Sequence, residues 1–297
     1  MEHIPGFRPF VDPSSKDPTT PFPLDDQDFS KVPDSTILSL FSTAPILHRF
    51  GGTQIVRLSR SLVLKGGSTV FPPESHAMAL AREKTQIRLP AVHRIIPGKP
   101  DDGVFGERCY IVMDYIDGVG LDVCWSNLDA GKRVDVADQI AAMIREMDNL
   151  ALPPVPGPIG GVRRWMGPWF SDYGAASCET VGEMEEWFNH KLDICERFRE
   201  VIPGTPHFSF RDDELVLTHQ DIAPRNIILD GSGNVWLIDW AYAGAYPPGF
   251  ERAAMLRQCE DQFKEFCDEV CKRITAYPVV EMQRLSIAYG LTTAALA

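Results

Sequence analysis

Apolar and polar positions along the first 116 residues follow the pattern of short, half-buried strands separated by polar turns. Four segments are rich in β-branched and aromatic residues and predict strands. They are QIVRLSR (54–60), SLVLK (61–65), TQIRLPAVHRII (85–96) and RCYIVMDYI (108–116). Between the second and the third, Pro72 and Pro73 open ESHAMALAREK, which predicts a helix. A shorter helix is expected within residues 35–47, capped by Asp34 or Ser35.

From about residue 130 the apolar positions recur every three or four residues, which is the spacing of helices. Two segments predict long helices: RVDVADQIAAMIREMDNL (133–150) and GEMEEWFNHKLDICERFREV (182–201). The apolar stripe of the first consists of Val136, Ile140, Met143, Ile144 and Met147. The chain is mostly helical again after Phe250. These patterns predict an α+β, bilobal fold, in which a small strand-rich lobe precedes a larger helical lobe.

Three regions of the chain are expected. Residues 1–34 hold seven of the 24 prolines and little apolar periodicity, which predicts an arm, extended or draped over the domain and without chemistry of its own. Residues 35–115 form the strand-rich lobe and residues 116–297 the helical lobe. The boundary between the lobes is expected near Tyr115 to Gly118.

The composition is that of an ordinary globular protein, with 44% hydrophobic and 24% charged residues. No apolar run is long enough for a transmembrane helix, and the N-terminal residues lack the features of a signal peptide. The odd number of scattered cysteines, seven, is typical of reduced thiols and predicts a cytoplasmic protein. The net charge of −12 disfavours nucleic acid polymers and anionic membranes as partners, and is compatible with a cationic small molecule.

Residues 217–244 contain the strongest chemical pattern of the chain. The runs LVL and IIL predict short strands, and VWLID predicts a return strand after the turn DGSGN. If residues 231–234 form a four-residue loop, Asn226 lies directly opposite Asp239 on one face of the hairpin. A shift of one residue would move Asp239 to the other face.

An amide oxygen beside a carboxylate suits a hard cation such as Mg²⁺. Asp221 lies in the loop just before this hairpin, close enough to receive a proton next to such a cation. Each of these residues alone is as readily explained as a turn or strand-end residue. The three together, at this spacing, indicate a metal-assisted catalytic site.

The motif HQDIAPRN followed by LIDW resembles the catalytic and metal-binding segments of the aminoglycoside phosphotransferase family, which includes choline kinases and has a protein-kinase-like fold. The resemblance extends over most of the chain, about residues 46–249, and is greatest to the fungal branch. It implies that Asp221 is the catalytic base and that Asn226 and Asp239 are Mg²⁺ ligands. It also implies that His219 supports the loop structurally.

The resemblance further implies that Lys65, at the end of SLVLK, binds the α- and β-phosphates of ATP. Taken alone, Lys65 is as readily a solvated strand-end residue. Glu74 at the start of the next helix shares one helical face with Met78 and Ala81, so its carboxylate points along the apolar stripe. A charge in that position needs a partner, and the family pairs the same two positions, so a Lys65–Glu74 ion pair is expected.

The segment YIVMDYIDG matches the family's hinge between the lobes. There the adenine would bind the backbone carbonyl of Asp114 and the backbone amide of Ile116. No glycine-rich GxGxxG loop is present, and only Gly51 and Gly52 precede the strand. Asp239 is not followed by phenylalanine and glycine, and no APE motif follows, which argues against a protein kinase.

The expected function is therefore an ATP- and Mg²⁺-dependent phosphotransferase acting on a hydroxyl of a small molecule, with amine-bearing molecules such as an aminoglycoside or amino alcohol as candidate acceptors. Acidic residues at 183, 185, 186, 260 and 261 either contact such an amine or form an ordinary solvated surface. The alternative is a pseudokinase that binds nucleotide or acts as a scaffold without transfer activity. The oligomeric state is not predicted by the sequence.

Overall fold

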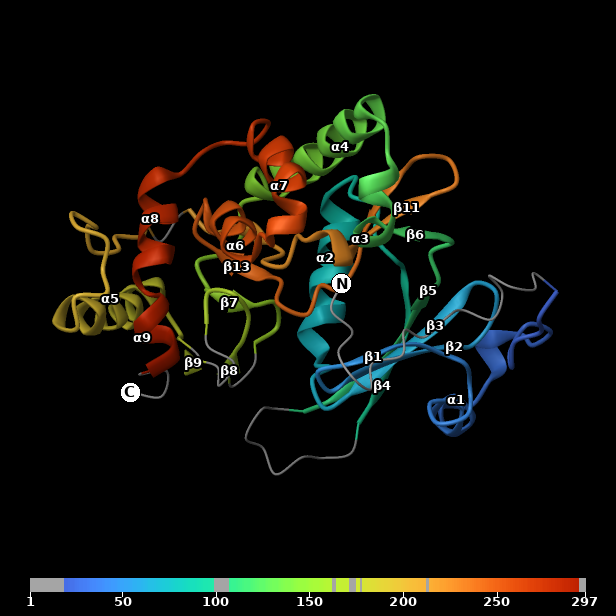
Figure 1. Ribbon diagram of the computed structural model, residues 1–297. Helices are drawn as coiled ribbons and strands as arrows, with labels where there is room; N and C mark the ends of the chain where they lie inside the picture. The colour runs from blue at the N-terminus through green and yellow to red at the C-terminus, as the bar shows by residue number, and fades with distance from the viewer. Residues whose placement is uncertain are drawn as a thin grey trace.

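The computed structural model describes residues 19–98, 107–161, 164–170, 175–176, 178–211 and 214–293. Residues 1–18 of the predicted arm lie outside the described residues. Figure 1 shows a strand-rich part at the lower right and a helical part above it and to the left. Within the described residues, no helix is long and apolar enough to span a membrane.

The strand-rich part is an antiparallel five-stranded sheet in the order β1-β2-β3-β5-β4. Its strands are β1 (Ile46–Phe50), β2 (Thr53–Arg57), β3 (Leu62–Gly67), β4 (Val92–Pro97) and β5 (Cys109–Asp114). Strand β1 was not predicted: it is half-exposed, interrupted by a bulge, and shows no clear alternation. The strand predicted over residues 85–96 is too long, because residues 85–91 cross toward the helical part, where the Arg88 carbonyl accepts a hydrogen bond from the Leu237 amide at 2.9 Å.

Both faces of this sheet are covered. On the inner face lies α2 (Pro72–Lys84), whose buried residues join the central core of the molecule. On the outer face lie residues 20–33 and α1 (Asp34–Leu40), which bury Leu24, Val32 and Ile37. Helix α1 is confirmed, but the predicted cap is wrong: Pro33 occupies the capping position without a side-chain bond, and Asp34 is already in the first turn.

The helical part contains the predicted long helices α4 (Ala130–Asp148) and α5 (Val181–Arg197), and the whole predicted stripe of α4 is buried. The other helices here are α3 (Leu121–Cys124), α6 (Phe250–Gln258), α7 (Lys264–Cys271), α8 (Pro278–Ser286) and α9 (Ala288–Thr293). Short strands β7 (Gly157–Pro158), β8 (Arg164–Trp165), β9 (Ala175–Ala176), β10 (Val216–Thr218) and β13 (Gly244–Tyr246) lie among them. The α+β, protein-kinase-like architecture is as predicted, whereas the division of the chain at residue 115 remains a prediction.

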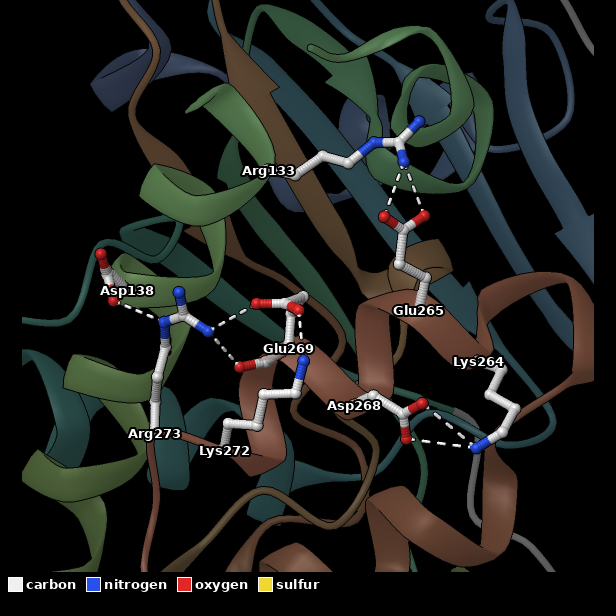
Figure 2. Close-up of polar contacts among 8 residues, drawn as sticks. All are labelled: Arg133, Asp138, Lys264, Glu265, Asp268, Glu269, Lys272 and Arg273. Atoms are coloured by element: carbon white, nitrogen blue, oxygen red, sulfur yellow. Dashed lines mark hydrogen bonds and ion pairs between the residues drawn. The ribbon is translucent and has the colours of Figure 1, made fainter. Parts of the chain in front are cut away.

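Helix α7 is fastened to α4 by ion pairs at the protein surface, shown in Figure 2. Arg133 donates to both carboxylate oxygens of Glu265, at 2.8 and 2.6 Å. Arg273, just after α7, bridges Asp138 of α4 at 2.6 Å and Glu269 of α7 at 2.8 Å. These contacts hold α7 beside the loop that contains Asp221.

The hairpin of β11 (Ile227–Asp230) and β12 (Val235–Leu237) forms as expected, but its predicted register is wrong by one residue. Ile228 pairs with Trp236 rather than with Leu237. The Asp230 carboxylate accepts bonds from the backbone of residues 232 and 234 and from the Trp236 indole, which closes a loop one residue shorter than predicted. Strand β6 (Gly118–Gly120) pairs with the other edge of β11.

Candidate active site

Lys65, Glu74 and Asp239 come from three different elements and meet in one ionic cluster. The Nζ atom of Lys65 on β3 lies 2.6 Å from Oε1 of Glu74 on α2 and 2.7 Å from Oδ1 of Asp239 after β12. Lys65 and Glu74 are almost fully buried, so the predicted pair is present. Burial alone would lower the pKa of Lys65, but the two carboxylates outweigh it and raise that pKa.

Asp239 reaches this cluster through an unusual backbone conformation. The register found in the hairpin would turn its side chain away from Asn226, yet its φ angle is +61°, a left-handed conformation that non-glycine residues rarely adopt. Such strain is typical of functional positions. The side chain is 40% exposed, and although burial opposes ionisation, contact with Lys65 lowers the pKa of Asp239. Its carboxylate is therefore held in the ionised form.

Asp221 is buried and both of its carboxylate oxygens accept hydrogen bonds. Oδ2 accepts from Nδ2 of Asn226 at 2.7 Å, and Oδ1 accepts from Arg225. Burial raises the pKa of Asp221 to about 6, against the opposing effect of Arg225. A carboxylate with such a pKa, in a fixed orientation, has the properties of a general base near neutral pH.

The backbone next to Asp221 is supported from two sides. The Nε2 atom of His219 lies 3.1 Å from the Ile238 carbonyl, and its Nδ1 atom accepts the Asp221 amide at 3.2 Å, which fixes a neutral tautomer. From α6, one oxygen of buried Glu251 accepts the amides of His219 and Gln220, at 2.5 and 2.9 Å. The sequence pattern did not identify Glu251, because a glutamate in the first turn of a helix is common for its favourable dipole interaction alone.

Arg225 and Gln258 complete a ring of hydrogen bonds around this loop, which the sequence analysis also missed. Nη2 of Arg225 donates to Gln258 Oε1 at 2.9 Å as well as to Asp221, and Gln258 Nε2 donates to the Gln220 carbonyl at 2.9 Å. A hollow opens beside them, lined by residues 222–225 and by side chains from residues 255–267. Most of these side chains are apolar; Arg225, Gln258 and Glu260 are the polar exceptions in the described lining.

Of the acidic residues predicted to face an amine-bearing acceptor, only Glu260 belongs to the described lining of this hollow. Glu183 accepts the backbone amide of Glu179, and Glu185 accepts that of Phe210, both at the surface around α5. Both carboxylates therefore have backbone partners around α5, which favours an ordinary structural role for these two glutamates.

The donors of the predicted metal site fit a hard cation. Asn226 uses its Nδ2 atom to donate to the backbone and side-chain oxygens of Asp221, at 2.9 and 2.7 Å. Its amide oxygen is left without a partner among the described residues. An amide oxygen and an ionised carboxylate, on Asn226 and Asp239, are oxygen ligands of the kind that Mg²⁺ prefers.

Asp114 is the last residue of β5, three residues after Ile111, which pairs with Lys65 in the sheet. Ile116, the other predicted hinge residue, follows the end of β5. The Asp114 carboxylate accepts the Ala91 amide at 2.8 Å and lies 2.6 Å from Nε2 of His93, so it is used within the lobe. The Ile116 amide, between β5 and β6, donates no hydrogen bond to any other described residue. The amide is therefore able to bind a ligand, and its contact with the adenine remains a prediction.

Comparison with known proteins matches this site to one family. A sequence profile described as "Phosphotransferase enzyme family" matches residues 55–281, which include the ionic cluster, the loop of Asp221 and the hairpin. The chain belongs to this family. It is accordingly a small-molecule kinase, which transfers a phosphoryl group to an alcohol.

Related proteins are distant in sequence. The thiamine kinases of Salmonella paratyphi A and Salmonella typhi are 23% identical to the chain over 236 residues, which cover 77% of this chain and 76% of theirs. The streptomycin–ATP ternary complex of APH(2″)-IIa is 16% identical with a TM-score of 0.53, covering 85% of this chain and 86% of that one. The GDP complex of aminoglycoside 2′-phosphotransferase-IIIa is 12% identical with a TM-score of 0.54, at 85% coverage of both chains. These solved structures confirm the fold.

Proposed function

We propose that this protein transfers the γ-phosphoryl group of ATP, in a Mg²⁺-dependent reaction, to a hydroxyl of a small molecule. The observation that carries the proposal is the meeting of Lys65, Glu74 and Asp239 in one cluster, although Lys65 and Asp239 are 174 residues apart in the chain. Only a fold that brings these three elements together provides both a buried cation for phosphates and a carboxylate for a metal.

Each residue has a proposed role. Lys65, kept in place by Glu74, binds the α- and β-phosphates, and the hinge binds the adenine through the Asp114 carbonyl and the Ile116 amide. Asp221 orients the acceptor hydroxyl and takes its proton. Bound at Asn226 and Asp239, Mg²⁺ would supply charge stabilisation to the phosphates. Most of the acceleration is expected from positioning and electrostatics.

The acceptor is proposed to be a hydroxylated molecule that carries an amine or another cationic group. Thiamine and the aminoglycosides named for the related proteins are of this kind. Arg225 and Glu260, which line the hollow, both interact electrostatically with Asp122, so two carboxylates and one guanidinium lie near one another there. The apolar lining favours an acceptor with one cationic group rather than many.

The test is ADP release by the full chain with Mg·ATP, screened over hydroxylated amines, sugars and amino acids. We expect one group of amine-bearing alcohols to raise ADP release well above the rate without acceptor, and expect chelation of Mg²⁺ to abolish it. If Mg·ATP binds but no acceptor raises the rate, the protein is better described as a nucleotide-binding pseudokinase. Turnover that continues without any divalent cation would contradict the proposed metal dependence.

A further inference from the structure

We propose that residues 20–34, here named the outer segment, position the hinge from behind the sheet and thereby set the affinity and selectivity for the nucleotide base. The inference rests on the proposed function, because it assumes that the hinge binds the base. It assigns a role in nucleotide recognition to a part of the chain that carries none of the phosphotransferase motifs. Two separate chains of side-chain contacts support it.

The first chain of contacts runs from Phe22 through Arg57 to Tyr115. The guanidinium of Arg57 on β2 lies between two rings, 4.7 Å from the centroid of Phe22 and 3.0 Å from that of Tyr115 in the hinge. Arg57 is only 3% exposed, and it donates to the carbonyls of Ser59 and Arg60 at 2.6 and 2.9 Å. A buried, planar cation fixed in this way transmits the position of one ring to the other.

The second chain of contacts runs from Phe29 through His93 to Asp114. The ring of Phe29 meets that of His93 edge-on, at 6.4 Å between centroids, and the guanidinium of Arg94 lies over the same phenylalanine at 4.5 Å. Nε2 of His93 lies 2.6 Å from the Asp114 carboxylate. Asp114 and Tyr115, two consecutive residues of the predicted hinge, are therefore each contacted by a side chain that also contacts an aromatic ring of the outer segment.

The outer segment is itself fixed to the sheet. The Leu24 amide donates to the Leu58 carbonyl at 2.9 Å, and the Asp25 carboxylate accepts the Arg60 amide at 2.7 Å. Arg94 donates to the carbonyls of Val32 and Phe29, at 2.5 and 3.0 Å. The segment thus acts as a support, and its buried residues Leu24 and Val32 join the cluster on the face of the sheet opposite α2.

The phosphate side of the nucleotide site does not depend on these contacts. Lys65 is held by Glu74 and Asp239, neither of which belongs to the two chains of contacts. Loss of the aromatic rings should therefore weaken recognition of the base and leave recognition of the phosphates unchanged. A merely structural role of the outer segment would affect both equally.

The experiment is calorimetric titration of the full chain with Mg·ATP and with Mg·tripolyphosphate, which has the phosphates but no base. The Phe22→Ala and Phe29→Ala double variant should bind Mg·ATP about tenfold more weakly, because the aromatic contacts to Arg57 and His93 are lost. Its affinity for Mg·tripolyphosphate should stay within about twofold of wild type. The ratio of ATP to GTP affinity should change in the same variant, because the hinge contacts the base.

Two matched controls keep the test decisive. Ile37→Ala removes a buried side chain of the same cluster from α1, outside the outer segment, so it should lower thermal stability and leave Mg·ATP affinity unchanged. Phe22→Tyr with Phe29→Tyr keeps both rings and should restore the affinity for Mg·ATP. An unchanged affinity for Mg·ATP in the double alanine variant would overturn the inference, as would equal losses for both ligands. If wild type bound Mg·tripolyphosphate as tightly as Mg·ATP, the base would add nothing to binding, and the proposed role of the hinge would be overturned as well.

Discussion

The ionic cluster and the hinge lie on neighbouring strands, β3 and β5, but are built in opposite ways. The cluster consists of charged side chains, Lys65, Glu74 and Asp239, that hold one another directly. The hinge offers backbone groups, and the side chains that hold it come from behind the sheet, through Arg57 and His93. A substitution in the cluster removes a chemical group, whereas a substitution behind the hinge only changes where a group lies. The two regions should therefore differ sharply in how much a single substitution lowers nucleotide affinity or turnover.

The largest effect is expected at Asp221, the proposed base for the acceptor hydroxyl. Asp221→Asn keeps the size of the side chain and removes the base, so turnover should fall about 10²- to 10⁴-fold. Binding of Mg·ATP should stay close to wild type, since Asp221 is not proposed to hold the nucleotide. Steady-state ADP release and calorimetry on the same preparation measure both quantities. A variant with nearly normal turnover would remove Asp221 from the role of base.

Glu74→Gln should break the cluster, because it leaves the buried cation of Lys65 with one carboxylate instead of two. The loss of a buried ionic partner typically costs about 3–5 kcal/mol when nothing replaces it, and the glutamine amide should offset part of this. We expect lower thermal stability and weaker binding of Mg·ATP and Mg·tripolyphosphate alike. Glu83→Gln on the same helix, an exposed position, is the matched control and should change neither. Weakened binding of ATP alone would place Glu74 with the hinge rather than with the cluster.

The carboxyl of Glu251 should make stability depend on pH. Burial raises its pKa to about 7, so in the folded protein it stays protonated at a pH where the unfolded chain is ionised. The contribution of this carboxyl to the free energy of unfolding is fully present below about pH 4.5. It is lost as the pH rises through about 7, and the loss is at most about 3 kcal/mol. Glu251→Gln keeps an oxygen for the two backbone amides and cannot ionise. The difference in unfolding free energy between variant and wild type should therefore grow in favour of the variant from pH 5 to pH 7.5, and a difference independent of pH would contradict the assignment.

The smallest effect is expected at the surface pair of Arg133 and Glu265, which joins α4 to α7 (Figure 2). A double-mutant cycle with Arg133→Ala and Glu265→Ala should give a coupling of about 0.5–1 kcal/mol. The coupling should shrink at 1 M salt, because exposed charges are screened. A coupling near zero, with Arg133→Ala alone still destabilising, would indicate that Arg133 acts by packing on Trp125 instead.

The two regions also differ in how far the sequence predicted them. The Lys65–Glu74 contact followed from the helical face that Glu74 shares with Met78 and Ala81, and the structure confirms it. The hairpin was predicted, but its register was wrong, because the bonds of the Asp230 carboxylate that shorten the loop leave no periodic signal. The left-handed conformation of Asp239 then directs its side chain to Lys65 in spite of that shift.

Contacts between distant segments were beyond the sequence pattern. Residues 20–34 were predicted to be an arm, because prolines obscure the few apolar positions that the sheet buries. Glu251 and Gln258, which support the Asp221 loop, lie on α6, 31 and 38 residues after Gln220. They share no motif with that loop. The sequence pattern identifies residues that belong to one motif or share one helical face. It does not identify those that act through the backbone of another segment.

The most direct test of the account is calorimetric titration of ATP, with and without Mg²⁺, into wild type and Asp239→Ala. The account predicts that wild type binds ATP more tightly with Mg²⁺ and that the variant loses this dependence, because a proposed metal ligand is gone. Equal dependence on Mg²⁺ in wild type and variant would contradict the assignment of the metal site. An absence of ATP binding by wild type under both conditions would contradict the proposed kinase function as a whole.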